Sequence, residues 1–318
     1  MTDMPTLLLT HTVSPARTDA LRPKLESRLP ESAVRSAATP EETREHLPEA
    51  EMLLVGRFHE EWFEYADELR LVQTLSAGVD FLPLSRIESE GVVLTNASGV
   101  HAEPIGEQVL AYMLQFERGL VETARNQRRG VWERVEGGEL RGKTAGIIGV
   151  GAIGSRVAEL CAAFGMAVVG TKRDTSDAPE AVDDLLPADE YHELLCRSDY
   201  VVLACPLTDE TEGLLGIPEF RLLDSDAVLV NIARGEVVDQ GALVRALQYG
   251  MIRGAALDVF EEEPLPPESV LWDLSNVVVT PHMAGSTPHK DERWIDIITT
   301  NYEALAADDL DAPVNRVR

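Results

Sequence analysis

The stretch "GIIGVGAIGSRVAEL" (146–160) contains three glycines in the spacing G-x-G-x-x-G, with an apolar run before them and a helical pattern after them. The first glycine of such a motif permits a tight turn, the second lets the backbone approach a pyrophosphate, and the third lets the helix pack closely on the strand. The phosphate charge then lies at the helix N-terminus, where N–H groups are unpaired. The stretch predicts a dinucleotide-binding domain. The residues expected to contact the dinucleotide here are Gly149, Gly151, Ala152, Ile153 and Gly154.

The next expected strand ends in "VVGTKRD" (168–174), at the place where a dinucleotide-binding domain reads the adenosine ribose. An acidic residue there binds the 2′-hydroxyl of NAD, whereas an arginine accommodates the 2′-phosphate of NADP. Arg173 can bind a phosphate with two hydrogen bonds, and Lys172 adds a second positive charge. These two residues favour NADP(H). Asp174 follows them directly, so use of NAD(H) stays open, as does a chance basic pair on a solvated loop.

Short apolar runs alternate with helical patterns along most of the chain. Most of the runs are continuously apolar, which is typical of strands covered on both faces in a parallel sheet. The expected strands lie within residues 5–11, 51–57, 69–76, 91–96, 144–150, 167–173, 199–206, 227–234, 254–260 and 276–282. The sequence therefore predicts an α/β protein with two sheets, of which the first contains four of these strands.

Two Rossmann-like or flavodoxin-like domains with a cleft between them are expected. The first, for substrate binding, comprises 1–98 together with 287–318, and the second, for dinucleotide binding, comprises 99–286. One long helix near 103–129 is expected to join them, because its apolar residues recur at helical spacing. A last helix near 288–307 has no strand after it and is expected to pack on the first domain.

The charge balance is strongly acidic. The 318 residues include 55 acidic and 28 basic residues, for a net charge of −27, and only four lysines. Such a charge disfavours nucleic acid and anionic membrane surfaces as partners. Because the acidic residues are scattered along the chain, they indicate a solvated surface and suggest a halophilic source, where salt would screen the repulsion. An ordinary acidic enzyme remains the alternative.

Other sequence features indicate a soluble cytoplasmic protein. The three cysteines, Cys161, Cys196 and Cys205, lie in apolar segments without metal-ligand spacing, so we expect reduced thiols in the core and no metal site. The N-terminal apolar run is too short for a signal peptide. No run reaches the roughly 18 apolar residues that a membrane-spanning helix needs.

Ionisable residues follow three of the expected strands. Arg234 stands in "VNIARGEVVD", Asp258 and Glu263 in "ALDVFEEEPLP", and His282 in "TPHMAGST". In an open parallel sheet, ligands bind beyond the carboxyl ends of the strands, so these side chains are expected to converge on the bound nicotinamide. Histidine suits proton transfer because its ordinary pKa lies near neutrality.

Taken together, the motifs resemble the D-2-hydroxyacid dehydrogenase family, which includes glycerate, phosphoglycerate and formate dehydrogenases. The resemblance covers nearly the whole chain. It rests on "SAGVD" (76–80), "GVGAIG" (149–154), "CPLTDET" (205–211), "VNIARGEVVD" (230–239), "ALDVFEEEPLP" (256–266) and "TPHMAGST" (280–287).

The resemblance implies a role for each site residue. His282 is the acid/base, Glu263 orients it and favours its charged form, and Arg234 binds the carboxylate of a 2-oxo acid and polarises its carbonyl. The loop of Ala77, Gly78 and Val79 holds that carboxylate through backbone amides. Asp258 resembles the residue that holds the nicotinamide carboxamide. The remaining residues expected around the cofactor are Pro206, Thr211, Ile232, Ala233 and Ala284.

Several alternatives stay open at this point. Glu261 and Glu262 adjoin Glu263, and only its position before Pro264 singles it out; His101 is read as structural, although it could contact the substrate. Glyoxylate, hydroxypyruvate and longer unbranched 2-oxo acids all fit the catalytic set. The resemblance also implies a homodimer formed through the dinucleotide-binding domain. The alternative function is a non-catalytic, nucleotide-sensing protein of the corepressor type on the same fold.

Overall fold

The computed structural model describes residues 4–79 and 81–317. The chain divides into two compact units, which we treat separately. Unit 1 contains the residues up to Val100 and those from Thr287 onward, and unit 2 is His101–Ser286. The chain passes between the units after residue 100 and after residue 286, and the first of these positions lies two residues beyond the boundary expected from the sequence.

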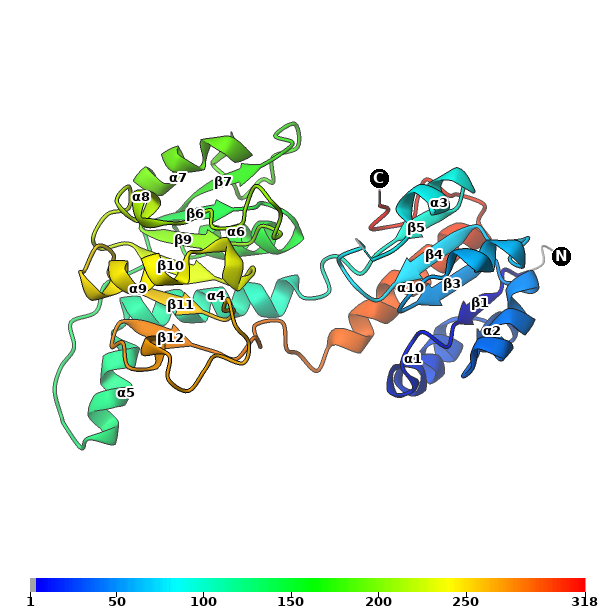
Figure 1. The fold of residues 1–318 in the computed structure, drawn as a ribbon, viewed down its shortest axis with the longest axis horizontal. Coiled ribbons are helices and arrows are strands. Elements are labelled where there is room, and N and C mark those ends of the chain that lie inside the picture. Colours follow the sequence, from blue (N-terminus) through cyan, green and yellow to red (C-terminus); the bar gives the residue numbers. More distant parts are fainter. Residues whose placement is uncertain (1–3, 80, 318) are drawn as a thin grey trace. The chain divides into compact units, whose positions relative to one another are not determined.

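Unit 1 is built on a parallel five-stranded sheet in the order β2-β1-β3-β4-β5 (Figure 1). The strands are β1 (Leu7–Leu9), β2 (Val34–Ser36), β3 (Met52–Val55), β4 (Leu71–Thr74) and β5 (Val93–Thr95). Four of them were expected, and β2 is a correction. It was missed because only Val34 of its three residues is buried, so it lacks the apolar run that marks the others.

Helices cover both faces of this sheet. The helices are α1 (Pro15–Arg28), α2 (Pro40–His46), α3 (Leu84–Ser89) and α10 (Lys290–Ala306). α1 and α10 pack on one face, where Leu21 and Leu25 meet Trp294 and Ile298. Trp62, from a short 3-10 helix at Glu60–Glu64, belongs to the cluster on the other face. The last helix of the chain therefore packs within the first unit.

Unit 2 contains a parallel seven-stranded sheet in the order β12-β11-β10-β9-β6-β7-β8. The strands are β6 (Thr144–Ile148), β7 (Ala167–Lys172), β8 (Asp184–Pro187), β9 (Tyr200–Leu203), β10 (Val228–Asn231), β11 (Gly254–Leu257) and β12 (Val277–Val279). β8 was not expected, because Asp184 and Pro187 interrupt its apolar character. The strand order reverses between β6 and β9, and ligands of such sheets bind at this switch point.

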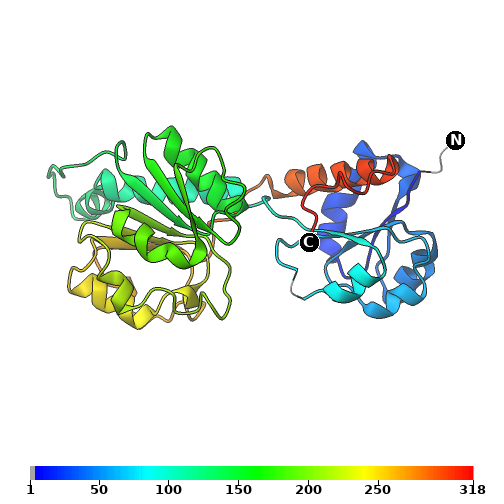
Figure 2. The same cartoon turned by 90° about the horizontal axis from the view of Figure 1, so that it is seen from above.

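Helices sandwich this second sheet, as Figure 2 shows from above. They are α4 (Ala102–Glu117), α5 (Leu120–Arg128), α6 (Ala152–Ala163), α7 (Tyr191–Arg197), α8 (Ile217–Phe220) and α9 (Gln240–Gln248). The single helix expected near 103–129 is wrong, because the chain breaks between α4 and α5 at Gly119, which adopts a φ of 61°. A side chain at this position would overlap Val135, so packing as well as backbone conformation requires a glycine here.

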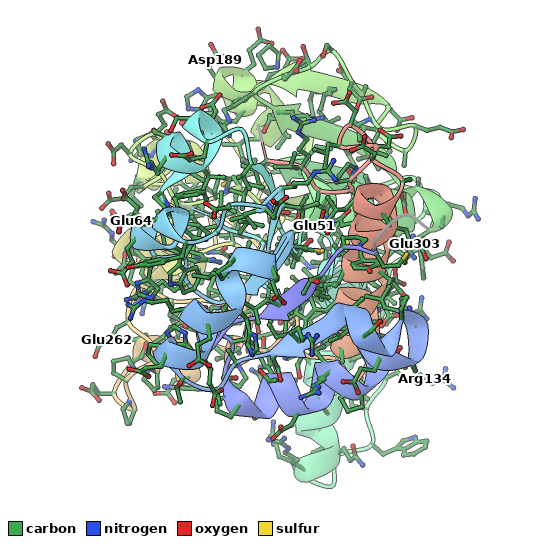
Figure 3. The ribbon with its side chains drawn as sticks, turned by 90° about the vertical axis from the view of Figure 1, so that its right-hand side faces the viewer. Glu51, Glu64, Arg134, Asp189, Glu262 and Glu303 are labelled. Atoms are coloured by element: carbon green, nitrogen blue, oxygen red, sulfur yellow. The ribbon has the colours of Figure 1, made fainter. Side chains whose placement is uncertain are left out.

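Acidic side chains are spread over the surface of both units. Figure 3 labels exposed examples at Glu64, Asp189, Glu262 and Glu303. All three cysteines are free, but Cys196 is exposed, which corrects the expectation that all three lie in the core. Among residues 4–79 and 81–317, no helix is both long and apolar enough to cross a membrane.

Candidate active site

The site residues of unit 2 follow six of its strands at their carboxyl ends. The glycine turn follows β6, Lys172 ends β7, and Pro206 follows β9 on the other side of the switch point. Arg234, Asp258 and His282 follow β10, β11 and β12. Because all seven strands are parallel, these segments lie at one edge of the sheet. The structure thus brings the expected cofactor and catalytic segments to the same edge.

The three glycines of the turn differ in what a side chain at each position would contact. Gly149 has a φ of 99°, and a Cβ there would lie 2.7 Å from the backbone nitrogen of Cys205. A Cβ on Gly154 would overlap the carbonyl oxygen of Gly149. Gly151 differs, because a Cβ there would meet nothing within 4 Å. Packing therefore explains the first and third glycines, whereas the second leaves open space.

That open space lies at the N-terminus of α6. Gly151 is the N-cap residue of the helix and provides no side-chain cap. Within the described residues, no oxygen accepts from the N–H groups of Ala152 and Ile153. Unpaired N–H groups and the positive end of the helix dipole favour an anion, and a glycine lets its atoms come close. The residues present therefore fit the pyrophosphate of a dinucleotide.

The basic pair lies beside this turn, at the end of β7. Lys172 Nζ donates to the carbonyl oxygen of Asp177 at 3.1 Å, whereas Arg173 is exposed and forms no ion pair within the described residues. Hydrogen bonds from Ser176 hold the pKa of Asp174 below its ordinary value, so this carboxylate is ionised and bound to its own loop. Within the part of the chain that the structure describes, Arg173 is therefore the basic group of the pair without an ion-pair partner.

His282 and Glu263 form a hydrogen-bonded pair. The Nδ1 atom of His282 lies 2.7 Å from Oε2 of Glu263, and the N–H of Phe260 donates to Oε1 at 3.0 Å. Burial raises the pKa of Glu263, but the hydrogen bonds from His282 and Phe260 and the charge of Arg234 outweigh it, so the pKa lies below its ordinary value. A carboxylate therefore faces Nδ1 and leaves Nε2 for another partner.

The three consecutive glutamates differ in their contacts. Glu261 accepts a hydrogen bond from the backbone N–H of Gln240 at 2.9 Å. Glu262 is exposed and points away from the unit, as Figure 3 shows. Of the three, only Glu263 contacts the histidine.

Arg234 is presented by a short turn after β10. The side chain of Asn231 spans this turn: its amide donates to the carbonyl of Arg234 at 3.0 Å, and its oxygen accepts from the N–H of Ala233 at 3.0 Å. The Arg234 side chain is exposed and donates to the carbonyl of Ala233 at 2.6 Å. Asn231 is only 1% exposed. Asn231 was not predicted as a site residue, although an asparagine at the end of a buried strand was a signal for it.

Asp258 is buried and already has partners. Its Oδ1 accepts from Thr280 Oγ1 at 2.6 Å and from Met283 N at 2.9 Å, and its Oδ2 accepts from Ala284 N at 2.8 Å. It therefore anchors the turn that carries His282. Because a carboxylate can accept about four hydrogen bonds, one position is left for a further donor such as a carboxamide.

The other expected cofactor residues frame the same edge. Thr211 Oγ1 donates to the carbonyl of Pro206 at 2.7 Å and so closes the turn after β9. Ile232, Ala233 and Ala284 are buried at 7%, 5% and 4% exposure, as packing residues of their turns.

The substrate loop expected from "SAGVD" lies in unit 1, after β4. The side chain of Asn96 donates to the carbonyl of Ala77 at 2.8 Å, and the carbonyl of Val79 accepts from Leu82 N at 2.9 Å. No acceptor for the N–H groups of Gly78 and Val79 occurs among the described residues. Asp80, the last residue of the motif, lies outside the described residues.

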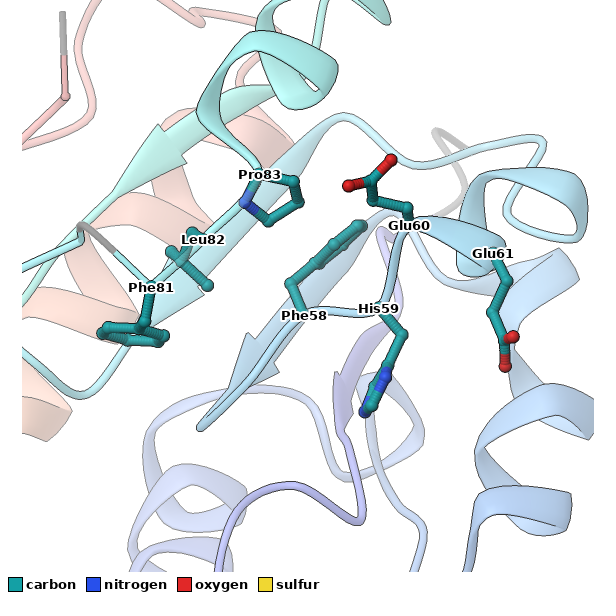
Figure 4. Close-up of a pocket in the computed structure, with 7 residues that line it drawn as sticks. All are labelled: Phe58, His59, Glu60, Glu61, Phe81, Leu82 and Pro83. Carbon is teal, nitrogen blue, oxygen red and sulfur yellow. The ribbon is translucent and has the colours of Figure 1, made fainter.

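Unit 1 also contains an open pocket formed by residues 58–61 and 81–83 (Figure 4). Phe58 and Leu82 are buried in its wall, whereas Phe81 is half exposed. Two exposed carboxylates, those of Glu60 and Glu61, stand along it. Their negative charge makes the pocket unfavourable for an anionic ligand.

Comparisons with known proteins identify the family. The sequence profile described as "D-isomer specific 2-hydroxyacid dehydrogenase, NAD binding domain" matches residues 110–284. The glyoxylate reductase of Aeropyrum pernix is 39% identical over 265 residues, covering 80% of this chain and 78% of that protein. The D-3-phosphoglycerate dehydrogenase of Methanocaldococcus jannaschii is 34% identical over 86% of this chain but only 52% of its own length.

A solved structure gives the same result. The D-isomer specific 2-hydroxyacid dehydrogenase from Xanthobacter autotrophicus Py2, in complex with NADPH and MES, is 30% identical with a TM-score of 0.78, and covers 99% of this chain and 98% of that one. The chain belongs to the D-isomer specific 2-hydroxyacid dehydrogenase family, and unit 2 carries the family's NAD-binding domain. It is therefore an oxidoreductase that acts on CH–OH groups, and the family expected from the sequence is confirmed.

Proposed function

We propose that this protein reduces 2-oxo acids to D-2-hydroxy acids, reversibly and preferably with NADPH, with His282 as the acid/base. The observation that carries the proposal is the pairing of His282 Nδ1 with an ionised Glu263. A carboxylate at Nδ1 stabilises the imidazolium and fixes the ring, so that Nε2 can give and take a proton. This arrangement suits a reaction in which a carbonyl oxygen becomes a hydroxyl.

Each residue has a stated task in this proposal. The bound nicotinamide supplies or accepts the hydride. His282 donates its Nε2 proton to the carbonyl oxygen during reduction and takes it back during oxidation. Arg234 binds the substrate carboxylate and stabilises the negative charge that develops on the carbonyl oxygen. The N–H groups of Gly78 and Val79 are proposed as a second contact for the carboxylate.

The proposed preference for NADPH over NADH rests on Arg173, which directly follows β7. Arg173 is exposed and has no ion pair among the described residues, so it can bind a 2′-phosphate without breaking another interaction. The structure of the Xanthobacter relative contains NADPH, which is consistent with this choice. Asp258, with one acceptor position left, is proposed to bind the carboxamide of the nicotinamide.

A homodimer through unit 2 forms part of the proposal. Trp132 is fully exposed, at 101%, on the segment after α5, and Leu120 at the start of α5 is 48% exposed. Figure 1 shows α5 and this segment extending from the body of the unit. Contact with a second copy would remove this apolar surface from water. Light scattering of Trp132→Ser would report a monomer if this surface forms the dimer.

The experiment that tests the reaction follows NADPH oxidation at 340 nm with glyoxylate, hydroxypyruvate and longer unbranched 2-oxo acids. The wild-type protein is expected to turn over at least one of them, and His282→Ala to lose nearly all activity while still binding NADPH. Tight nucleotide binding without turnover by the wild type would favour a sensor of the corepressor type. An unchanged rate in His282→Ala would exclude the proposed acid/base.

A further inference from the structure

The turn after β12 is tied to Asp258 by four hydrogen bonds. Three connect the carboxylate to Thr280 Oγ1, Met283 N and Ala284 N, as described above. The fourth runs from the N–H of His282 to the backbone carbonyl of Asp258, at 2.8 Å. One buried residue, which is 2% exposed, therefore holds the backbone of residues 282–284 and the side chain of Thr280 before the histidine.

This anchoring matters because His282 has an unusual backbone conformation. Its φ is 50°, in the left-handed region, which costs a residue with a side chain about 1 kcal/mol or more. Surrounding contacts must compensate for such a conformation. If they weaken, the backbone can relax to a negative φ, and the imidazole then turns away from Glu263.

The hydroxyl of Thr280 connects this anchor to α4. Tyr112 OH on α4 forms a short hydrogen bond with Thr280 Oγ1. Thr280 has one hydroxyl proton, which it donates to the Asp258 carboxylate, so the phenol must donate to Thr280. Burial raises the pKa of Tyr112, which keeps the phenol protonated and able to donate. The result is a directed chain from Tyr112 through Thr280 to Asp258.

The same helix also holds the far end of the turn. Nδ1 of His101, the residue before α4, lies 3.0 Å from the carbonyl oxygen of Gly285. A carbonyl only accepts, so Nδ1 is the donor. Tyr112 itself is fully buried and packs among Val109 and Met113 in the core of unit 2. α4, through Tyr112, and the residue before it, His101, therefore hold the two ends of residues 280–285.

We propose that Tyr112 and Thr280 are positioning residues for the reaction: their hydrogen-bond chain to Asp258 holds the turn in which His282 presents its imidazole. His101 supports the other end. The inference rests on the proposed function, because it assumes that His282 transfers the proton. It adds Tyr112, which lies 168 positions before Thr280 and outside all the quoted motifs.

The test compares two buried tyrosines that differ in what their hydroxyls contact. Tyr112→Phe removes the donor to Thr280. Tyr200→Phe is the matched control, because Tyr200 is 1% exposed in the same core and its hydroxyl donates to Glu117 instead. We expect Tyr112→Phe to lower kcat about tenfold or more, because small misplacement of a catalytic group is costly. KM for the cofactor and the 2-oxo acid should change less than about twofold, since neither contact is lost.

A second readout reports the chemical step. When proton and hydride transfer become slower relative to product release, the isotope effect on kcat with deuterated NADPH increases. This increase is expected for Tyr112→Phe and not for Tyr200→Phe, even where both variants lose similar thermal stability. Equal kcat and equal isotope effects in the two variants would overturn the inference.

A second pair of variants, both at Thr280, decides the matter if Tyr112→Phe does not fold. Thr280→Ser keeps the hydroxyl and should keep most of the rate, whereas the isosteric Thr280→Val should lose it. Wild-type rates in both would overturn the proposed positioning role. The underlying function is judged separately: an active His282→Ala would exclude it, whereas an inactive His282→Ala with a fully active Tyr112→Phe excludes only the positioning chain.

Discussion

His282 and Glu263 lie 2.7 Å apart, Nδ1 to Oε2, although 19 residues separate them in the chain. Reduction needs a protonated imidazole, so kcat/KM for the 2-oxo acid should fall as pH rises, and oxidation of the hydroxy acid should improve. Glu263→Gln removes the negative charge that favours the imidazolium. We expect this variant to have a lower kcat/KM for reduction than the wild type, because a neutral amide stabilises a charged ring less than a carboxylate does. Steady-state rates from pH 5 to 9 measure this.

Glu262→Gln is the control, because it makes the same change in charge on the neighbouring, exposed residue. Identical profiles for the two variants would contradict the pairing. The pair also affects stability. The folded pKa of Glu263 is depressed, so its contribution is present above the unfolded pKa and is lost as pH falls through the folded pKa.

A second prediction concerns the cofactor. In Lys172→Ala with Arg173→Ala, we expect KM for NADPH to rise about tenfold or more, because a phosphate loses a charge-assisted contact, while KM for NADH changes little. The ratio of kcat/KM for the two cofactors measures the preference. Arg221→Ala, which removes an exposed arginine after α8, should leave the ratio unchanged. A ratio that also stays unchanged in the double variant would show that the basic pair does not read the phosphate.

A third prediction concerns a buried charge in unit 2. Glu117 has a side-chain exposure of 2% and contacts Arg253 at 2.9 Å and the hydroxyl of Tyr200 at 2.8 Å. Arg253→Ala removes the nearer of the two cations that pair with this carboxylate and leaves only the longer contact with Lys143, at 3.8 Å. We expect the free energy of unfolding to fall by about 3 kcal/mol, as is typical when a buried pair loses one partner. Urea denaturation at fixed salt measures it.

The control for that experiment is Arg197→Ala. Arg197 pairs with Asp184 and Glu193, but all three side chains are 40–56% exposed. Exposed ion pairs contribute about 0.5 kcal/mol to the free energy of unfolding, so Arg197→Ala should be nearly as stable as the wild type. Similar losses in the two variants would mean that burial of Glu117 does not determine its contribution.

The sequence predicted elements that carry their own local signal. Most strands are continuous apolar runs, and the turn at Gly149 and Gly154 is required by contacts within a few residues or with the adjacent strand. The break at Gly119 was missed because a helical pattern does not reveal the positive φ that this glycine adopts between α4 and α5. Local patterns therefore predict the sheets better than the breaks between helices.

In the candidate site, too, residues with a local sequence signal were predicted and residues that act through distant contacts were not. His282, Glu263 and Arg234 stand in recognisable motifs at strand ends. Tyr112 lies in the helical pattern expected near 103–129, but its spacing gives no sign of a hydroxyl bonded to Thr280, 168 residues away. Supporting contacts of this kind need the fold before they can be found.

The last prediction separates cofactor binding from packing at the glycine turn. A Cβ at Gly151 would meet nothing within 4 Å, and its φ of −96° suits any residue, so Gly151→Ala should fold with an unchanged Tm. The methyl group would occupy the space proposed for the pyrophosphate, and we expect KM for NADPH to rise about tenfold or more, as a good contact is lost. Gly154→Ala should instead destabilise the fold by about 1–3 kcal/mol, because its methyl group overlaps the carbonyl of Gly149. Thermal unfolding and cofactor titration of both variants distinguish the roles: loss of stability without loss of affinity in Gly151→Ala would place the dinucleotide elsewhere.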